Sequence, residues 1–333
     1  MMRLPPFRYL KPKTAREAAR MLDDHARDDA MAVSGGTDLY PNMKRRQFEP
    51  KVLVGLRALE GGREIALGSD GGLEIGGLAT LQALERSELL HGRSPALAKA
   101  AGLVSSPTLR HMGTIGGNLC VDTRCTYYNQ TYDWRKAIDF CMKKDGAVCW
   151  VAPSSPRCWA VSSSDTAPVL IALDASVILV GPSGERRIPV KDLYRADGID
   201  FTTRKREEIL TAIHLPAPNG VRATYLKLRR RGSIDFPILG VAAAIRTAKD
   251  GTVTSARIVL TAVESAPLEA EKAQALLLGK KLSVDLIEEA AALAYRPAKP
   301  LDNTDLSYPY RKKMTKVEVA RALRDVAGPS SGV

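Results

Sequence analysis

The sequence lacks an apolar run long enough to cross a membrane. A membrane-spanning helix needs about 18 or more consecutive apolar residues, and the run from Ile238 to Ile245 is among the longest in this chain of 333 residues. The first residues, Met1 to Pro6, include no apolar core of a signal peptide. We therefore expect a cytoplasmic protein that does not associate with a membrane.

The motifs of several common enzyme classes are also missing. The chain has no H-E-x-x-H, G-x-S-x-G, Walker P-loop or G-x-G-x-x-G sequence, the marks of zinc proteases, serine hydrolases, nucleoside triphosphatases and Rossmann dinucleotide sites. Its four histidines show no paired ligand spacing: His25, His91, His111 and His214. These absences disfavour an ordinary Rossmann site, and we assign no residue of this chain to catalysis on a substrate.

Acidic residues are outnumbered by basic ones, but the excess does not predict a nucleic-acid site. The formal net charge is +12 and the pI about 9.5. The basic clusters are short and far apart in sequence (44–46, 229–231 and 311–313), and no nucleic-acid-binding motif accompanies them. A basic face can equally meet acidic partner subunits or a phosphate-bearing cofactor, which is the interpretation that we prefer.

Aromatic residues make up only 5% of the chain, yet they gather in one stretch that also holds most of the cysteines. Four of the five cysteines and two of the three tryptophans lie between Cys125 and Cys158, and Trp159 follows directly. The spacing C-x15-C-x7-C-x8-C contains none of the C-x2-C pairs of common zinc sites, and it is not a ferredoxin-type run. Spacing alone therefore does not identify a metal.

Residues 124–162 are nevertheless predicted to form an insertion that holds a metal or iron–sulfur centre. A loop of this length cannot easily bury a core of its own, and four thiolate bonds would fix it. The aromatic side chains would exclude water from a redox centre. Disulfides are disfavoured by the odd number of cysteines and by a reducing compartment. Buried structural cysteines are the alternative, and Cys120, just before the stretch, is interpreted as a buried apolar residue and not a ligand.

The rest of the chain has the pattern of an α+β protein in two parts. Residues 1–217 mix predicted strands and helices; Thr14 and Glu17 form a capping box in the first of these helices. Further predicted elements are a hairpin and two helices (64–77, 80–90 and 95–103). A Pro/Gly-rich linker then leads to residues 218–333, where period-two alternation predicts an antiparallel sheet backed by helices.

Two glycine-rich loops lie in the first part. Ser34-Gly35-Gly36-Thr37-Asp38-Leu39 follows a predicted strand, and Gly113-Thr114-Ile115-Gly116-Gly117-Asn118 precedes the insertion. Backbone N–H groups of such loops can converge on an anion, and side chains in place of the glycines would block its close approach. Each loop alone could be a tight turn, but two in one domain favour a bound cofactor with a phosphate or ribityl chain.

These loops and three later segments resemble a known family. The later segments are Ser164-Asp165-Thr166-Ala167-Pro168, Lys227-Leu228-Arg229-Arg230-Arg231 and Tyr310-Arg311. In this order they resemble the FAD-binding subunit of the molybdenum hydroxylases, which include xanthine dehydrogenase and carbon monoxide dehydrogenase. The inserted cysteines resemble the beta subunits of 4-hydroxybenzoyl-CoA reductases, whose insertion binds a [4Fe-4S] cluster. The resemblance implies a FAD-binding domain of two α/β subdomains, interrupted by the insertion and followed by a C-terminal α+β domain.

The resemblance also implies two cofactor sites. The first loop would meet the FAD pyrophosphate through backbone N–H groups, and the second loop would form the other wall. Asp165 would hydrogen-bond the ribityl or ribose, Leu210 would pack near the flavin ring, and Lys227 would lie near the isoalloxazine. The implied FAD-binding residues are Ser34, Gly35, Gly36, Thr37, Asp38, Leu39, Thr114, Gly116, Gly117, Asn118, Asp165, Leu210 and Lys227. The implied cluster ligands are Cys125, Cys141, Cys149 and Cys158.

On this resemblance the chain is expected to carry electrons within a larger oxidoreductase. They would pass between the [4Fe-4S] cluster, FAD and the [2Fe-2S] centres of a small partner, and finish at the molybdenum cofactor of a large partner. There an aromatic acyl-CoA would lose its ring hydroxyl. The implied assembly is a dimer of heterotrimers with an external redox partner such as ferredoxin. Two alternatives remain: the flavin subunit of an aldehyde- or N-heterocycle-oxidising enzyme, and a non-redox protein with a structural zinc loop.

Overall fold

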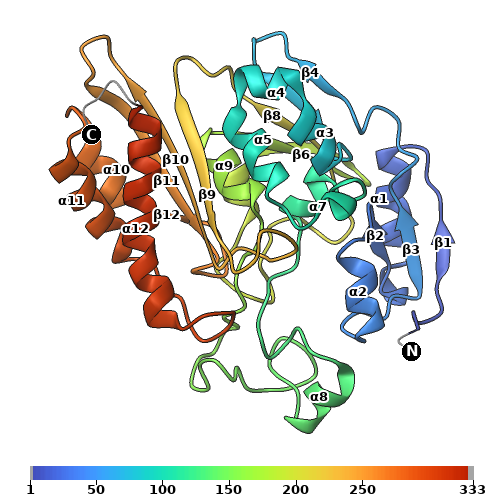
Figure 1. Cartoon of the computed structure of the whole chain (residues 1–333). Helices are drawn as coiled ribbons and strands as arrows, with labels where there is room; N and C mark the ends of the chain where they lie inside the picture. The colour runs from blue at the N-terminus through green and yellow to red at the C-terminus, as the bar shows by residue number, and fades with distance from the viewer. Residues whose placement is uncertain (1–2, 329–333) are drawn as a thin grey trace.

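The computed structural model describes residues 3–328, which form three sheets with helices packed around them (Figure 1). One small sheet is parallel, and the two larger sheets are antiparallel. This arrangement confirms the α+β fold class predicted from the sequence. No helix in residues 3–328 is both long enough and apolar enough to span a membrane.

The chain begins with the parallel sheet, whose strand order is β1-β3-β2. The Thr14 hydroxyl accepts a hydrogen bond from the Glu17 N–H at 3.1 Å, and the Glu17 carboxylate accepts one from the Lys13 N–H at 2.7 Å. The predicted cap is therefore present, with the carboxylate bound one residue earlier than in a standard capping box. The elements are β1 (Arg8–Leu10), α1 (Ala15–Asp24), the 3-10 helix η1 (Ala26–Asp28), β2 (Met31–Val33), α2 (Leu39–Lys44) and β3 (Val52–Gly55).

A five-stranded antiparallel sheet of order β4-β5-β8-β6-β7 follows. The helix predicted over 80–90 is divided in two at Ser87, whose extended backbone ends α3 and whose hydroxyl caps α4. The strands are β4 (Ile65–Leu67), β5 (Leu73–Gly76), β6 (Ser176–Gly181), β7 (Gly184–Pro189) and β8 (Ile209–Leu215). The helices are α3 (Leu81–Arg86), α4 (Glu88–Arg93), α5 (Pro95–Gly102), α6 (Pro107–Arg110), α7 (Ile115–Leu119), α9 (Thr166–Ala172) and η2 (Val190–Leu193).

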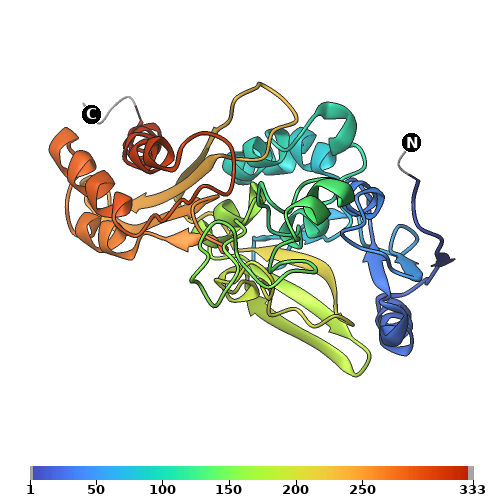
Figure 2. The ribbon, with the colours of Figure 1, turned by 90° about the horizontal axis from the view of Figure 1, so that it is seen from below.

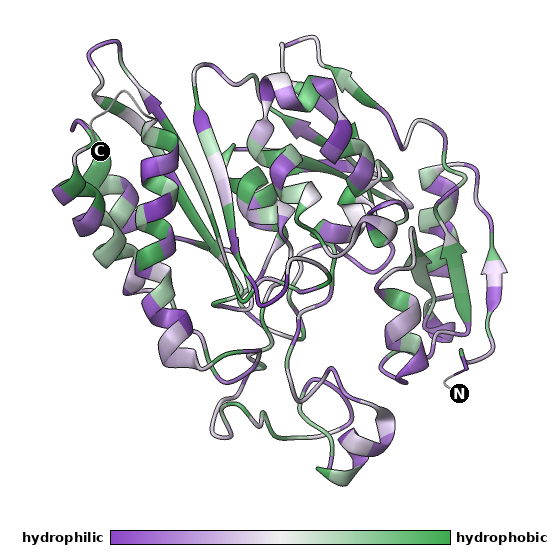
Figure 3. Ribbon diagram, in the orientation of Figure 1, coloured by the Kyte–Doolittle hydropathy of each residue, from purple (hydrophilic) through white to green (hydrophobic). Residues whose placement is uncertain are grey.

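The C-terminal sheet is buried on both faces. Along β10, Val241 and Ala243 belong to the core shared with the C-terminal helices, while Ala242 and Ala244 belong to the core shared with α5 and α9. This alternation follows from the period of two along a strand. The apolar strands of the C-terminal sheet stand out in Figure 3. The elements are β9 (Arg222–Leu228), β10 (Leu239–Thr247), β11 (Val253–Thr261), β12 (Leu268–Glu269), α10 (Glu271–Leu277), α11 (Val284–Tyr295) and α12 (Tyr308–Ala327).

Residues 124–162 project from this body as a long irregular insertion that carries the short helix α8 (Tyr132–Ala137) (Figure 1). Two hydrogen bonds between Arg124 and Val161, of 2.8 and 2.7 Å, close its neck. Viewed from below, the insertion lies across the middle of the molecule (Figure 2). The insertion therefore begins and ends at one point of the fold, which leaves the surrounding sheets intact.

Candidate functional site

The two glycine loops, far apart in sequence, touch each other in the structure. The hydroxyls of Ser34 and Thr114 are 2.9 Å apart, within hydrogen-bond distance. A Cβ atom at Gly35 would lie 1.9 Å from the Met112 carbonyl oxygen, so only glycine permits this approach. Gly36 has a φ of 71°, in the left-handed region that favours glycine. The sequence Gly35-Gly36 thus meets two separate steric demands.

The first loop presents a row of unpaired backbone donors. Within the described part of the chain, the N–H groups of residues 35–39 donate no hydrogen bond to the protein. The loop connects the end of β2 to the start of α2, where free N–H groups and the helix dipole favour an anion. The Asp38 carboxylate does not cap α2; it pairs with Arg124 and accepts a hydrogen bond from Asn42 at 3.1 Å. Since the loop's N–H groups are left free, they can bind a phosphate.

The second loop serves mainly to pack and orient. The Thr114 hydroxyl caps α7 by accepting the Gly117 N–H at 3.2 Å, and the Gly116 N–H donates to the Gly77 carbonyl at 2.9 Å. A Cβ atom at Gly116 would lie 2.7 Å from that carbonyl oxygen. The Asn118 side-chain oxygen accepts bonds from the start of α9, including one of 2.7 Å from the Thr166 hydroxyl. This loop therefore forms a rigid wall.

A cavity of about 700 Å³, which we call the glycine-loop cavity, opens between the two loops. Its volume lies in the range of small-molecule and cofactor sites. Leu210 of β8 contributes an apolar wall. The structure brings together eleven of the predicted FAD-binding residues as lining of this cavity: Ser34, Gly35, Gly36, Thr37, Asp38, Leu39, Thr114, Gly116, Gly117, Asn118 and Leu210. Free N–H donors at one wall and an apolar surface at another fit a dinucleotide that carries a pyrophosphate and a flat ring.

Two predicted FAD-binding residues, Asp165 and Lys227, do not line this cavity. They form an ion pair of 2.9 Å whose side chains are 2% and 1% exposed. The Tyr225 hydroxyl donates to Asp165 at 2.7 Å, and Lys227 also donates to the Leu103 carbonyl at 2.9 Å. Burial raises the pKa of Asp165 and lowers that of Lys227, while each partner opposes the shift of the other. The pairing joins the N-terminal end of α9 to β9, and the contacts of these two residues with the ribityl chain and the isoalloxazine stay predictions.

The four cysteines of the insertion, the predicted cluster ligands, lie around one cavity. Cys125, Cys141, Cys149 and Cys158 are each at most 7% exposed, and all four line one small cavity, the cysteine cavity. Their other neighbours there are mainly aromatic and aliphatic side chains. Among residues 3–328, however, no three His, Cys, Asp or Glu side chains are gathered closely enough to hold a single metal ion. Cys120 lies outside this group, partly buried beside the glycine-loop cavity.

The thiols of the cysteine cavity influence one another's pKa values. Burial, with a smaller contribution from the charges of neighbouring cysteines, raises the pKa of Cys125 to about 12 and that of Cys158 to about 11. Backbone N–H groups and, at Cys158, the Lys143 ammonium lower them in part. A bound metal would remove these protons, because coordination stabilises the thiolate far more than burial destabilises it.

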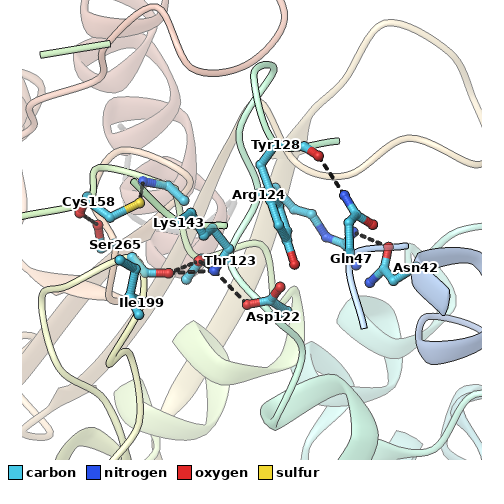
Figure 4. A network of polar contacts seen from close by, with 12 residues as sticks. Asn42, Gln47, Asp122, Thr123, Arg124, Tyr128, Lys143, Cys158, Ile199 and Ser265 are labelled. Atoms are coloured by element: carbon cyan, nitrogen blue, oxygen red, sulfur yellow. Dashed lines mark hydrogen bonds and ion pairs between the residues drawn. The ribbon is translucent and has the colours of Figure 1, made fainter. Parts of the chain in front are cut away.

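Polar contacts that the sequence did not reveal attach the insertion to the body (Figure 4). The buried Arg124 pairs with Asp38 of the first glycine loop, and the Gln47 amide donates to the Tyr128 carbonyl at 2.6 Å. The buried Arg135 donates to the carbonyls of Arg45 and Arg46, each at 3.0 Å. Apart from Asp38, these residues belong to no motif. The one signal in the sequence is that Arg124 and Tyr128 lie near Cys125.

Known proteins match this chain over nearly its whole length. The family "FAD binding domain in molybdopterin dehydrogenase" matches residues 5–218, and the family "CO dehydrogenase flavoprotein C-terminal domain" matches residues 223–326. The carbon monoxide dehydrogenase medium chain of Afipia carboxidovorans is 30% identical over 319 residues, 95% of each chain. The aldehyde oxidoreductase FAD-binding subunit PaoB of Escherichia coli is 33% identical over 283 residues, 81% of this chain and 86% of that protein.

The fold leads to the same family. A chain in the structure of carbon monoxide dehydrogenase from Hydrogenophaga pseudoflava superimposes with a TM-score of 0.81 and 28% identity, covering 98% of both chains. The chain therefore belongs to the FAD-binding subunits of the molybdenum hydroxylase family of oxidoreductases.

Proposed function

We propose that this chain is an electron-transfer subunit that holds FAD in the glycine-loop cavity and a [4Fe-4S] cluster in the cysteine cavity. The observation that carries the proposal is the grouping of four buried cysteines around one cavity next to a dinucleotide-sized one. A tetrahedral zinc ion, with Zn–S bonds of about 2.3 Å, would hold its sulfurs about 3.8 Å apart. A cluster with one cysteine per iron holds them further apart, which suits cysteines that share a cavity but do not meet at one point.

The residues of the chain would bind and orient the flavin. The free N–H groups of residues 35–39 would hold the pyrophosphate, and Leu210 would pack against the ring. FAD, when bound, supplies one- and two-electron chemistry that no side chain provides. The chain's own contribution is to fix the distance between the cofactors and to exclude water from both cavities.

The substrate would be converted on a partner chain. The relatives are described as a medium chain and as a FAD-binding subunit, which implies further subunits around them. We propose a large partner with a molybdenum cofactor and a small partner with [2Fe-2S] clusters, assembled as a dimer of heterotrimers, with ferredoxin as the external donor. The net charge of +12 suits docking against acidic subunits.

For the whole complex we propose reductive dehydroxylation of 4-hydroxybenzoyl-CoA. The four-cysteine insertion supports this assignment. The similarity to an aldehyde oxidoreductase subunit favours the second candidate, oxidation of an aldehyde or an N-heterocycle. Purified complex would be tested for dehydroxylation of the CoA thioester with a low-potential electron donor, and for oxidation of aromatic aldehydes with an electron acceptor. Turnover of aldehydes alone would reject the first candidate.

The cofactors are tested first, by comparing two cysteine variants of the complex purified anaerobically. We expect one FAD for each copy of this chain. Cys141→Ser should lose about four iron and four sulfide relative to the wild type, while Cys120→Ser, the matched control, should lose none. Equal iron in Cys141→Ser and the wild type would contradict the cluster assignment. Zinc in place of iron, in a protein without FAD, would support the structural zinc loop instead.

A further inference from the structure

The two cavities share a wall made by Lys143 and Tyr128. Both residues line the glycine-loop cavity and the cysteine cavity. Tyr128 is 2% exposed, and the Lys143 side chain is 6% exposed. The two cavities therefore adjoin each other at these two residues.

The Lys143 ammonium is held in one place. It donates hydrogen bonds to Asp122 Oδ1 and Thr123 Oγ1, each at 2.8 Å, and to the Gly198 carbonyl at 2.6 Å (Figure 4). These three bonds use all three of its donors. The ring of Tyr128 lies 4.9 Å from Nζ. A lysine that is fully bonded inside the protein is a fixed positive charge and not a mobile surface group.

The two partners of the ion pair between Lys143 and Asp122 lie differently with respect to the two cavities. Lys143 lines both cavities, whereas Asp122 lines the glycine-loop cavity and not the cysteine cavity. On the far side, Gly198 connects the ammonium to Cys158: its carbonyl accepts from Lys143, and its N–H donates to the Cys158 carbonyl at 3.0 Å. Lys143 but not Asp122 thus borders the cysteine cavity, and its charge acts on the Cys158 thiol, in a buried region where charges act strongly.

We propose that Lys143 is a positioning residue that sets the reduction potential of the centre in the cysteine cavity, with Asp122 opposing it. This inference rests on the proposed [4Fe-4S] cluster. Each electron that enters the cluster comes from an external low-potential reductant, and no bond is made or broken. Because reduction adds a negative charge, the nearby ammonium favours the reduced cluster and the carboxylate disfavours it.

The test is a redox titration of the anaerobic complex with dithionite as reductant, followed by the electron paramagnetic resonance signal of the reduced cluster. Lys143→Met should shift the midpoint potential to more negative values, and Asp122→Asn should shift it to more positive values. Lys136→Met is the matched control: this lysine lies on α8 in the same insertion and is exposed. The midpoint potential of the cluster in Lys136→Met should stay at the wild-type value.

The outcomes separate this inference from the proposed function. Shifts of opposite sign in the two buried variants, with wild-type iron content, would support it; a purely structural role for Lys143 would not predict the opposite shift in Asp122→Asn. If Lys143→Met fails to retain iron, Asp122→Asn alone still decides. Full iron and unshifted potentials would overturn this inference and leave the cluster in place. A wild-type protein with FAD but no iron beyond its partners' clusters would overturn the cluster itself, and with it this role of Lys143.

Discussion

Among single residues, the buried pair of Asp165 and Lys227 has the clearest energetic consequence. Removing one partner leaves the other charged and buried, which costs about 3–5 kcal/mol. We expect Asp165→Asn and Lys227→Met each to lower the free energy of unfolding by about that amount. The double variant should be less destabilised than the sum of the two, because it leaves no unpaired charge.

Urea unfolding of the three variants would measure this coupling. Arg206→Met supplies the control, since Arg206 is 65% exposed and its partner Asp29 is 76% exposed. An exposed pair contributes about 0–1 kcal/mol. If the buried single variants were no less stable than this control, the pair would not hold α9 and β9 together.

Glu208 provides a test by pH. Its carboxylate accepts two hydrogen bonds from Arg186, of 2.7 and 2.9 Å, and these hold the pKa of Glu208 below its usual value of 4.5. A carboxyl with a lower pKa in the folded state adds stability above its unfolded pKa and loses it as the pH falls through the folded value. Glu208→Gln should therefore be less stable than the wild type near neutral pH.

The difference in stability between the wild type and Glu208→Gln should shrink once the pH falls below 4.5. It should vanish at lower pH, where both proteins carry a neutral side chain at position 208. Urea midpoints of the two proteins at several pH values would follow it. A difference that stayed constant from neutral to acidic pH would mean that Glu208 acts through its shape and not through its charge.

At the scale of elements, the first glycine loop is the most constrained segment. An L side chain with positive φ costs about 1–2 kcal/mol, and a Cβ atom at Gly36 would lie 2.2 Å from the Tyr40 ring. Gly36→Ala should therefore weaken FAD binding by about tenfold or more. Titration of the apoprotein with FAD, followed by flavin fluorescence, would measure this. Gly92→Ala on α4 is the control, because a Cβ atom there meets nothing within 4 Å; equal affinity of both variants would reject the assignment.

Local patterns predicted most elements, because their cause is local. The hairpin over 64–77 and the antiparallel sheet in residues 218–333 follow from alternation and turn residues, and both are present. The helix expected over 80–90 is broken at Ser87, which caps the second helix while its extended backbone ends the first. Serine can either continue a helix or begin one, and packing decides between these outcomes.

At the scale of the molecule, the sequence predicted which motif residues line the two cavities. It did not predict the long-range contacts that form the wall between them. Glycine and cysteine motifs located both cavities, because those residues meet a local steric or chemical demand. The pairing of Asp165 with Lys227 across the domain boundary could not be read from the sequence, and their predicted contacts with FAD stay predictions. Lys143 was missed because its position between the cavities depends on contacts with segments far along the chain. Such long-range pairs leave no periodic pattern.

Arg311 joins the C-terminal domain to the insertion through contacts between residues that are far apart in the sequence. Its side chain is 0% exposed and lies at the N-terminal end of α12. It donates to the Leu301 carbonyl at 2.7 Å, to the Ala262 carbonyl, and to the Asn303 side chain at 3.3 Å. Asn303 in turn donates to the Trp159 carbonyl at 2.6 Å, close to the neck of the insertion. Burial lowers the pKa of Arg311 to about 10, so it remains charged at neutral pH.

We expect Arg311→Met to destabilise the C-terminal domain and to loosen the insertion together. Each buried acceptor that loses its partner costs about 1–3 kcal/mol, so the free energy of unfolding should fall by at least about 3 kcal/mol. Lys316→Met on the same helix is the control, because Lys316 is 48% exposed and its partner Glu288 is 43% exposed. Urea unfolding would give the stability, and the rate of proteolysis within residues 126–158 would report on the insertion. Faster cleavage there in Arg311→Met than in Lys316→Met is the expected result. Unchanged cleavage with lower stability would mean that the insertion is held independently of the C-terminal helix.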